Sequence, residues 1–183
     1  MPRIWSFHLP TRIEFGRGVF RRLGQRAAAI GERALLVGYR QPGPLATVYE
    51  RAMAALRQSG VKAELLLVAE PEPTVDHLSA AATQATPLGA DLVVGLGGGS
   101  VLDLAKGLAA CLAAGPRVLA ALAAPGELPQ VTEALPVLAV PTTTGTRAEV
   151  TSVAVFTEPA DPRPGTGSFF GPLRAEKCAC PLP

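Results

Sequence analysis

The sequence predicts an α/β domain in which helices cover both faces of a parallel β-sheet. Short apolar runs alternate with longer amphipathic segments along most of the chain, which is typical of successive strand–helix units. A glycine-rich stretch, GLGGGS at 95–100, lies between one such run and a helical segment. Ligands of parallel sheets bind beyond the carboxyl ends of the strands, so this stretch is also the first candidate site.

The predicted strands are short, mostly apolar runs that are too brief for helices. They lie at residues 12–15, 34–37, 63–68, 91–94, 137–140 and 152–156.

The predicted helices have apolar residues at helical spacing and residues that mark their ends. They lie at 19–30, 45–59, 75–85 and 101–114. Gly60 ends the second of these helices, and Thr74, with Pro73 before it, caps the third. Gly115 and Pro116 end the fourth helix sharply.

Composition limits the function classes. The chain has 183 residues, enough for one domain with a sizeable core, and its net charge of +2 gives no electrostatic case for nucleic acid or an acidic membrane as a partner. Residues 1–10 do not form a secretory signal, and no apolar run is long enough to span a membrane, so we expect a cytoplasmic protein. Cys111 is expected to be a small buried residue, whereas Cys178 and Cys180 are too few for a zinc site.

The glycine-rich stretch predicts an anion site. Gly97, Gly98 and Gly99 carry no Cβ, so a phosphate oxygen can approach their backbone. The next N–H groups belong to a helix N-terminus, where free donors and the helix dipole favour an anion. The first functional hypothesis is therefore a cofactor that carries a diphosphate.

A structural interpretation of the same residues remains open. Ser100 could cap the helix while Asp103 bonds back to it, as in a capping box, and Lys106 could pair with Asp103. The spacing also differs from the usual dinucleotide fingerprint and from a P-loop, which needs Gly-Lys-Ser/Thr.

Two longer strings resemble one known family. The string Gly97–Lys106, GGGSVLDLAK, resembles the signature of the iron-containing (group III) alcohol dehydrogenases. The string Pro141–Thr151, PTTTGTRAEVT, resembles that family's second signature, roughly PTTxGTGSEVT. Phe15–Gly18 and Glu70–Thr74 are weaker matches in the same order, and the resemblance covers about residues 4–157.

The resemblance implies a parallel-sheet dinucleotide-binding domain, of the dehydroquinate synthase type, that binds NAD or NADP. It implies that Gly97, Gly98, Gly99 and Ser100 approach the pyrophosphate, that Asp103 lies near the nicotinamide and ribose, and that Lys106 belongs to the same cofactor-binding signature. The hydroxyls of Thr142, Thr143 and Thr146 can donate to phosphate or ribose oxygens, although a solvated turn is the alternative for that run.

Two positions depart from the family pattern. Many NAD-preferring relatives carry an Asp at about Tyr39, where it can bond the adenosine ribose; this chain instead offers Arg40, which could pair with a 2′-phosphate and so points to NADP or mixed use. Arg147 stands where the motif usually has Gly, so either the backbone is conventional there or the loop is altered.

The family's metal ligands are not expected in this chain. Family members hold iron or zinc through one Asp and three His on a helical domain, beyond the point where the resemblance stops. This sequence has two histidines, His8 and His77, and neither matches a ligand motif. We therefore expect an NAD(P)-binding domain at 1–157 and an irregular Pro/Gly-rich tail at 158–183, which suggests a truncated or frame-shifted reading frame or a separate partner half.

The leading hypothesis is an NAD(P)-dependent alcohol dehydrogenase that transfers hydride reversibly between a small alcohol or aldehyde and nicotinamide, metal-assisted in the full-length family. This chain alone is expected to be inactive. The glycerol dehydrogenase and maleylacetate reductase branches stay open, although the PTTTGT run favours the alcohol dehydrogenase branch. The rival from another class is a non-catalytic nucleotide-binding module or a truncated remnant. An apolar face is expected where a second domain would dock, and homo-oligomer formation could cover it.

Overall fold

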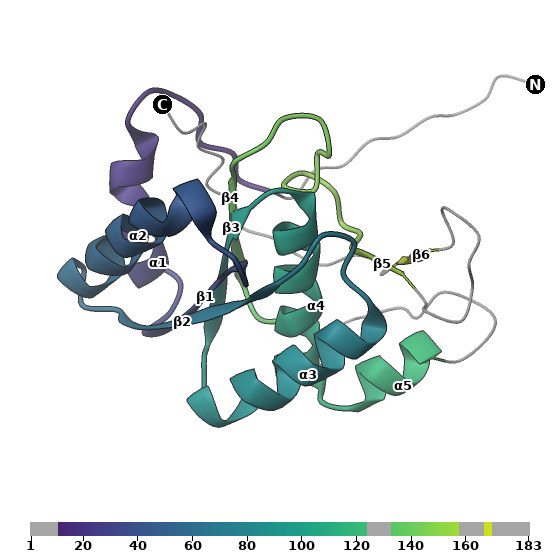
Figure 1. Ribbon diagram of the computed structural model, residues 1–183. Helices are drawn as coiled ribbons and strands as arrows, with labels where there is room; N and C mark the ends of the chain where they lie inside the picture. The colour runs from purple at the N-terminus through teal and green to yellow at the C-terminus, as the bar shows by residue number, and fades with distance from the viewer. Residues whose placement is uncertain (1–10, 124–132, 158–166, 170–183) are drawn as a thin grey trace, which may run out of the picture.

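A parallel sheet forms the centre of the molecule (Figure 1). The computed structural model describes residues 11–123, 133–157 and 167–169. Within these residues, four strands pair in the order β2-β1-β3-β4, and all three neighbouring pairs are parallel. The strands are β1 (Arg33–Tyr39), β2 (Lys62–Ala69), β3 (Leu92–Gly97) and β4 (Val137–Pro141). The predicted fold class is confirmed.

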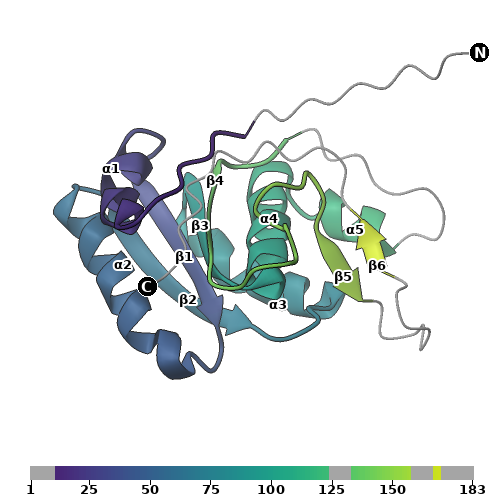
Figure 2. The same ribbon diagram turned by 90° about the horizontal axis from the view of Figure 1, so that it is seen from above.

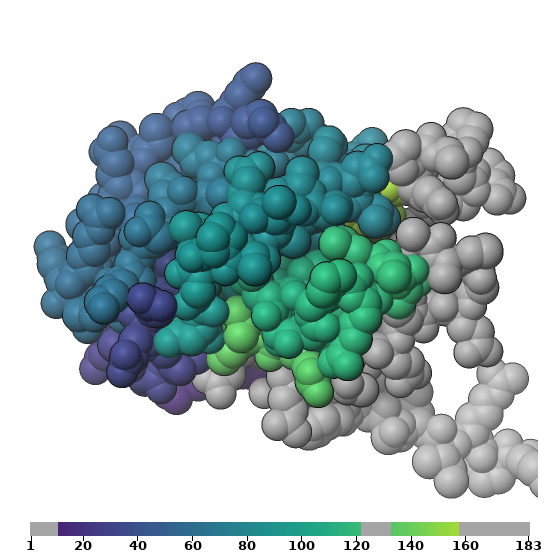
Figure 3. Space-filling model, turned by 90° about the horizontal axis from the view of Figure 1, so that it is seen from below, coloured from purple at the N-terminus to yellow at the C-terminus, as the bar shows by residue number. Residues whose placement is uncertain are grey.

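Helices cover both faces of this sheet (Figure 2). One face packs against η1 (Val19–Arg22), α1 (Leu23–Ala28) and α2 (Ala46–Gln58). The other face packs against α3 (Val75–Ala85), α4 (Gly99–Ala114) and α5 (Arg117–Ala123). Two short 3-10 turns, η2 (Gly43–Leu45) and η3 (Thr86–Leu88), precede α2 and follow α3. Figure 3 shows α3 and α5 side by side on one outer face.

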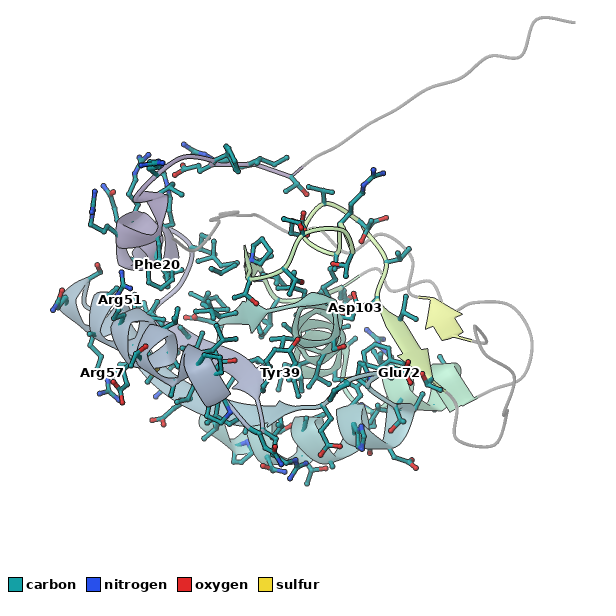
Figure 4. The ribbon with its side chains drawn as sticks, turned by 45° about the horizontal axis from the view of Figure 1, so that its top comes forward. Phe20, Tyr39, Arg51, Arg57, Glu72 and Asp103 are labelled. Atoms are coloured by element: carbon teal, nitrogen blue, oxygen red, sulfur yellow. The ribbon has the colours of Figure 1, made fainter. Side chains whose placement is uncertain are left out.

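The alternation of side chains along β1 explains why both faces need a cover. Leu35 and Val37 pack toward α3 and α4, whereas Ala34 and Leu36 pack toward α1 and α2, as the two-residue period of a strand requires. The helices η1 and α2, on the same side of the sheet as α1, are also joined by a cation–π contact. The Arg51 guanidinium lies 5.6 Å from the centre of the Phe20 ring (Figure 4).

Helix α4 lies between the sheet and the outer helices and is almost wholly buried. Its Gly107 allows close packing, since a Cβ there would lie 2.6 Å from Phe156 Cζ. Cys111 is buried as expected, and this burial raises the pKa of its thiol to about 12. Among the described residues, no helix has the length and apolar character needed to cross a bilayer.

One predicted element is wrong and two others differ from the structure in their extent or type. Residues 12–15 form no strand. Instead, the Glu14 carboxylate forms ion pairs with Arg12, Arg22 and Arg26, so ion pairs and not strand hydrogen bonds hold this segment in place. The predicted helix at 19–30 is a 3-10 turn followed by one short α-helix. The predicted strand at 152–156 shortens to β5 (Val155–Thr157), which pairs antiparallel with β6 (Gly167–Phe169) outside the main sheet.

Other boundaries match or shift slightly. Helix α3 has the predicted bounds, because Thr74 Oγ1 accepts a hydrogen bond from the His77 N–H and fixes its start. Helix α4 ends at Gly115, as predicted, with a φ of +75°, but the sequence reading missed α5 directly after it. His8, Cys178, Cys180 and the predicted tail at 158–183, apart from 167–169, lie outside the described residues.

Candidate functional site

The strand order creates a crevice between β1 and β3. From β1 the chain moves outward to β2, and it then returns to the other side of β1 to form β3 and β4. A ligand of such a sheet lies at the point where the order reverses, outside the carboxyl ends of the strands. At this edge, β1 ends at Tyr39, β3 at Gly97 and β4 at Pro141.

The loops that leave these three strands contact one another at the glycine run. The Gly98 N–H donates to the Tyr39 hydroxyl at 3.3 Å, and the Thr142 N–H donates to the Gly97 carbonyl at 2.9 Å. A Cβ at Gly98 would lie 2.7 Å from the Tyr39 hydroxyl oxygen and 3.0 Å from Thr143 Oγ1.

The next glycine contacts the loop that follows β4, residues 142–150, which is called the second loop below. A Cβ at Gly99 would lie 2.8 Å from Thr146 Cγ2. Only glycine lets the two loops approach this closely. The structure thus brings together the predicted Gly97, Gly98 and Gly99 with Tyr39 and the threonine loop.

The N-terminus of α4 presents free donors, although not in the predicted way. Gly98 is the N-cap residue, with an extended backbone and no side-chain cap, and α4 already includes Gly99 and Ser100. The alternative interpretation, a capping box of Ser100 and Asp103, does not form, because Ser100 lies within the first turn. Within the described part of the chain, the N–H groups of Gly99 and Ser100 have no hydrogen-bond acceptor, so both are available to an anion.

Asp103 and Lys106 form a buried pair one turn further along α4. Lys106 is buried, and its Nζ lies 3.6 Å from Asp103 Oδ1. The same Nζ donates to the Val153 carbonyl at 2.6 Å and lies 3.3 Å from Thr151 Oγ1. Lys106 thus ties α4 to the segment after the second loop, and its contact with a cofactor stays a prediction.

Burial shifts both groups of this pair toward their neutral forms. Desolvation raises the pKa of Asp103, and it does so despite the opposing effect of the Lys106 charge. Desolvation likewise lowers the pKa of Lys106, although the Asp103 and Glu149 charges act against it. Figure 4 shows Asp103 at the end of α4 that faces the second loop.

Arg40 has a partner on the neighbouring strand end. Its Nε lies 2.6 Å from Glu70 Oε1, directly after β2, and its backbone N–H donates to the Ala69 carbonyl. His77 Nε2 lies 3.7 Å from the other Glu70 oxygen. An acid therefore does lie at this corner, but it follows β2 and does not stand at position 39.

Arg147 has a left-handed backbone. Its φ is +54°, in the left-handed region that favours glycine. The backbone at this position is therefore not conventional, and a residue with a Cβ holds it at a cost in backbone strain.

Sequence reasoning missed Glu70 as the partner of Arg40, and it missed Tyr49. The buried Tyr49 hydroxyl accepts a hydrogen bond from the Tyr39 N–H at 3.0 Å, and burial raises its pKa. The spacing of Tyr49 from Ala52 and Leu56 on α2 could have indicated that it faces the core.

A metal site does not fit the residues that the structure describes. Over 11–123, 133–157 and 167–169, no group of three or more His, Cys, Asp or Glu side chains could hold a metal ion. His77 instead completes the cap of α3, since its Nδ1 lies 3.4 Å from the Thr74 nitrogen.

The fold and the site define the class: a parallel α/β domain whose glycine loop lies at the reversal of strand order, with free helix donors beside it. The particular family follows from sequence comparison. The chain belongs to the iron-containing alcohol dehydrogenase family, whose sequence model matches residues 10–169.

Known relatives agree with this assignment. A choline dehydrogenase of Bacillus subtilis is 32% identical over 86% of this chain and 39% of its own length. An NADPH-dependent butanol dehydrogenase of Clostridium saccharobutylicum is 26% identical over 83% of this chain and 38% of its own. The crystal structure of an iron-containing alcohol dehydrogenase from Thermotoga maritima superposes with a TM-score of 0.84 at 27% identity, covering 97% of this chain and 48% of that one. The chain thus spans less than half the length of these proteins.

Proposed function

We propose that this chain binds a nicotinamide dinucleotide, NAD or NADP, as the cofactor-binding part of an alcohol dehydrogenase. The observation that carries the proposal is the meeting of Tyr39, Gly98 and Thr143 at the switch point of the sheet, beside the free N–H groups of Gly99 and Ser100. A diphosphate would accept hydrogen bonds from those donors. The hydroxyls of Thr142, Thr143 and Thr146 would contact phosphate or ribose oxygens.

The adenosine end would lie toward Arg40 and Glu70, and the nicotinamide end toward Asp103. This division follows from the positions of these residues on either side of the glycine loop, with β1 and β2 on one side and the second loop on the other. In the whole protein, a hydride would pass between an alcohol carbon and nicotinamide C4. Residues 1–157 would form the cofactor domain.

Titration of the full chain with NADH and NADPH, followed by nicotinamide fluorescence, tests the proposal. We expect saturable binding that ADP displaces. Absence of binding by both nucleotides would contradict it.

A second candidate is a nucleotide-binding module without turnover, which the lack of a metal-ligand group among the described residues favours. Under this candidate the purified chain binds NADH but oxidises no simple alcohol. Alcohol turnover that a chelator abolishes would reject it.

A further inference from the structure

We propose that the Tyr39 hydroxyl is itself a ligand of the cofactor diphosphate, held in place by Tyr49. The proposal rests on the proposed function and assigns Tyr39 a role different from that of the ribose-binding Asp of many relatives. The geometry places the phenol oxygen 3.3 Å from the nitrogen of Gly98, the N-cap residue of α4, whereas the pair of Arg40 with Glu70 lies after β1 and β2.

The hydrogen bonds of Tyr39 leave its proton available. A phenol oxygen can accept and donate at once. Here it accepts from the Gly98 N–H at 3.3 Å, and in the described part of the chain its own proton has no acceptor. A phosphate oxygen beside the Gly99 and Ser100 N–H groups would accept a hydrogen bond from that hydroxyl. Because the hydroxyl already accepts a hydrogen bond from Gly98, it is a stronger donor.

Tyr49 fixes the position of Tyr39. Its hydroxyl, fully enclosed beneath β1, accepts the Tyr39 N–H at 3.0 Å. Gly38 makes this approach feasible, because a Cβ there would lie 2.5 Å from Tyr49 Cζ. Two successive hydrogen bonds, from Tyr39 to Tyr49 and from Gly98 to Tyr39, thus connect α2 to the glycine loop. Tyr49 acts as a positioning residue, and Tyr39 as the residue that touches the cofactor.

If Tyr39 blocks the anion site and does not bind the anion, the expected effect on cofactor affinity has the opposite sign. If its ring merely occupied the anion site in the empty protein, a ligand would have to displace it, and removal of the hydroxyl would tighten binding. If the hydroxyl is a ligand, its removal weakens binding of every compound that carries the diphosphate and of no compound that lacks it.

The test compares Tyr39→Phe with the wild-type full chain in titrations with NADH, ADP and adenosine. A hydrogen bond to a charged group corresponds to roughly tenfold or more in affinity, so we expect a loss of that size for NADH and ADP and no change for adenosine. The Tyr49→Phe variant is the matched control, since it loses a buried hydroxyl that does not touch the cofactor. We expect it to lower the urea midpoint of unfolding, with a smaller loss of NADH affinity.

Equal or tighter binding of NADH and ADP by Tyr39→Phe would overturn the proposal, as would an equal loss for adenosine. Failure of the proposed function gives a different result. If the wild-type chain binds ADP but neither NADH nor NADPH, the nicotinamide assignment is contradicted. The role of Tyr39 can then still be tested with ADP. Wild-type chain that binds none of them would overturn both.

Discussion

Two ion pairs lie on either side of the glycine loop, and they differ in both distance and burial. Arg40 and Glu70 approach to 2.6 Å, but their side chains are 57% and 38% exposed. Lys106 and Asp103 are 3.6 Å apart, yet their side chains are only 1% and 14% exposed.

We expect burial, and not distance, to determine how much each pair contributes to stability. Exposed ion pairs contribute about 0–1 kcal/mol, because water screens them and ordering the side chains costs entropy. Removal of one partner of a buried pair leaves an uncompensated charge away from water, which is far more destabilising. We therefore expect the Lys106 side to control stability and the Arg40 side to adjust cofactor preference.

The largest expected effect is that of Lys106→Met. The substitution strands Asp103 without its counter-charge and removes the bond to the Val153 carbonyl, so we expect a loss of about 3–5 kcal/mol in the free energy of unfolding, measured with urea. The double variant Asp103→Asn, Lys106→Met should recover part of the loss. A loss below about 1 kcal/mol would remove the distinction between the two pairs.

The pH dependence of stability is the next test of the buried pair. The folded pKa of Asp103 is raised above its ordinary value of 3.8, so the folded state holds the proton more strongly than the unfolded chain. The stability that this group contributes is fully present below pH 3.8 and is lost as the pH rises through the folded pKa.

Asp103→Asn isolates this contribution from the other carboxyls. The difference in unfolding free energy between wild type and the variant should fall as the pH rises from 3.8 toward neutrality. A difference that stays constant, or that rises over this range, would contradict the raised pKa.

The exposed pair should change specificity with little effect on stability. Glu70→Gln releases Arg40 from its 2.6 Å contact, so a 2′-phosphate could pair with the guanidinium instead. We expect the ratio of NADPH to NADH affinity to rise by up to about fivefold, the equivalent of roughly 1 kcal/mol, while the free energy of unfolding changes by less than about 0.5 kcal/mol.

Arg40→Asp is the converse variant, and it should raise the relative affinity for NAD. An NAD/NADP ratio that neither variant changes would show that this corner does not contact the adenosine ribose.

These two pairs also show what the sequence could predict. The Lys106–Asp103 pair follows from helical spacing, and the α3 bounds follow from Thr74, because both are local features of the chain. The glycine loop and the threonine loop could be found as strings, and the strand–helix alternation predicted the parallel sheet.

The remaining contacts depend on strand order, which spacing does not encode. Tyr39 reaches Gly98 across 59 residues only because β3 pairs with β1, and Glu70 reaches Arg40 only because β2 pairs with β1 on its other side. The wrong cap at Ser100 has a local cause: an extended Gly98 can serve as N-cap without a side chain, so α4 starts earlier than the first capping hydroxyl.

The smallest expected change in the free energy of unfolding is that of Arg147→Gly, in the loop that leads to the Lys106–Asp103 pair. Arg147 holds a φ of +54°, and its carbonyl accepts the N–H groups of Val150 and Thr151, which starts the turn that carries Thr151 to Lys106. Arg147→Gly relieves the left-handed strain, about 1–2 kcal/mol for a residue with a Cβ, but also gives the unfolded chain more freedom, so we expect a net gain of only about 0.5 kcal/mol.

Arg147→Ala separates the backbone from the charge, because it removes the guanidinium and keeps the Cβ. If backbone strain causes the effect, the Ala variant has the urea midpoint of the wild type and only the Gly variant has a higher one. A gain shared by both variants would mean that the Arg147 side chain, and not its backbone, opposes the loop. The stability of the second loop would then depend on an exposed charge, as that of the Arg40–Glu70 pair does. The two sides of the site would then differ less in what determines their stability.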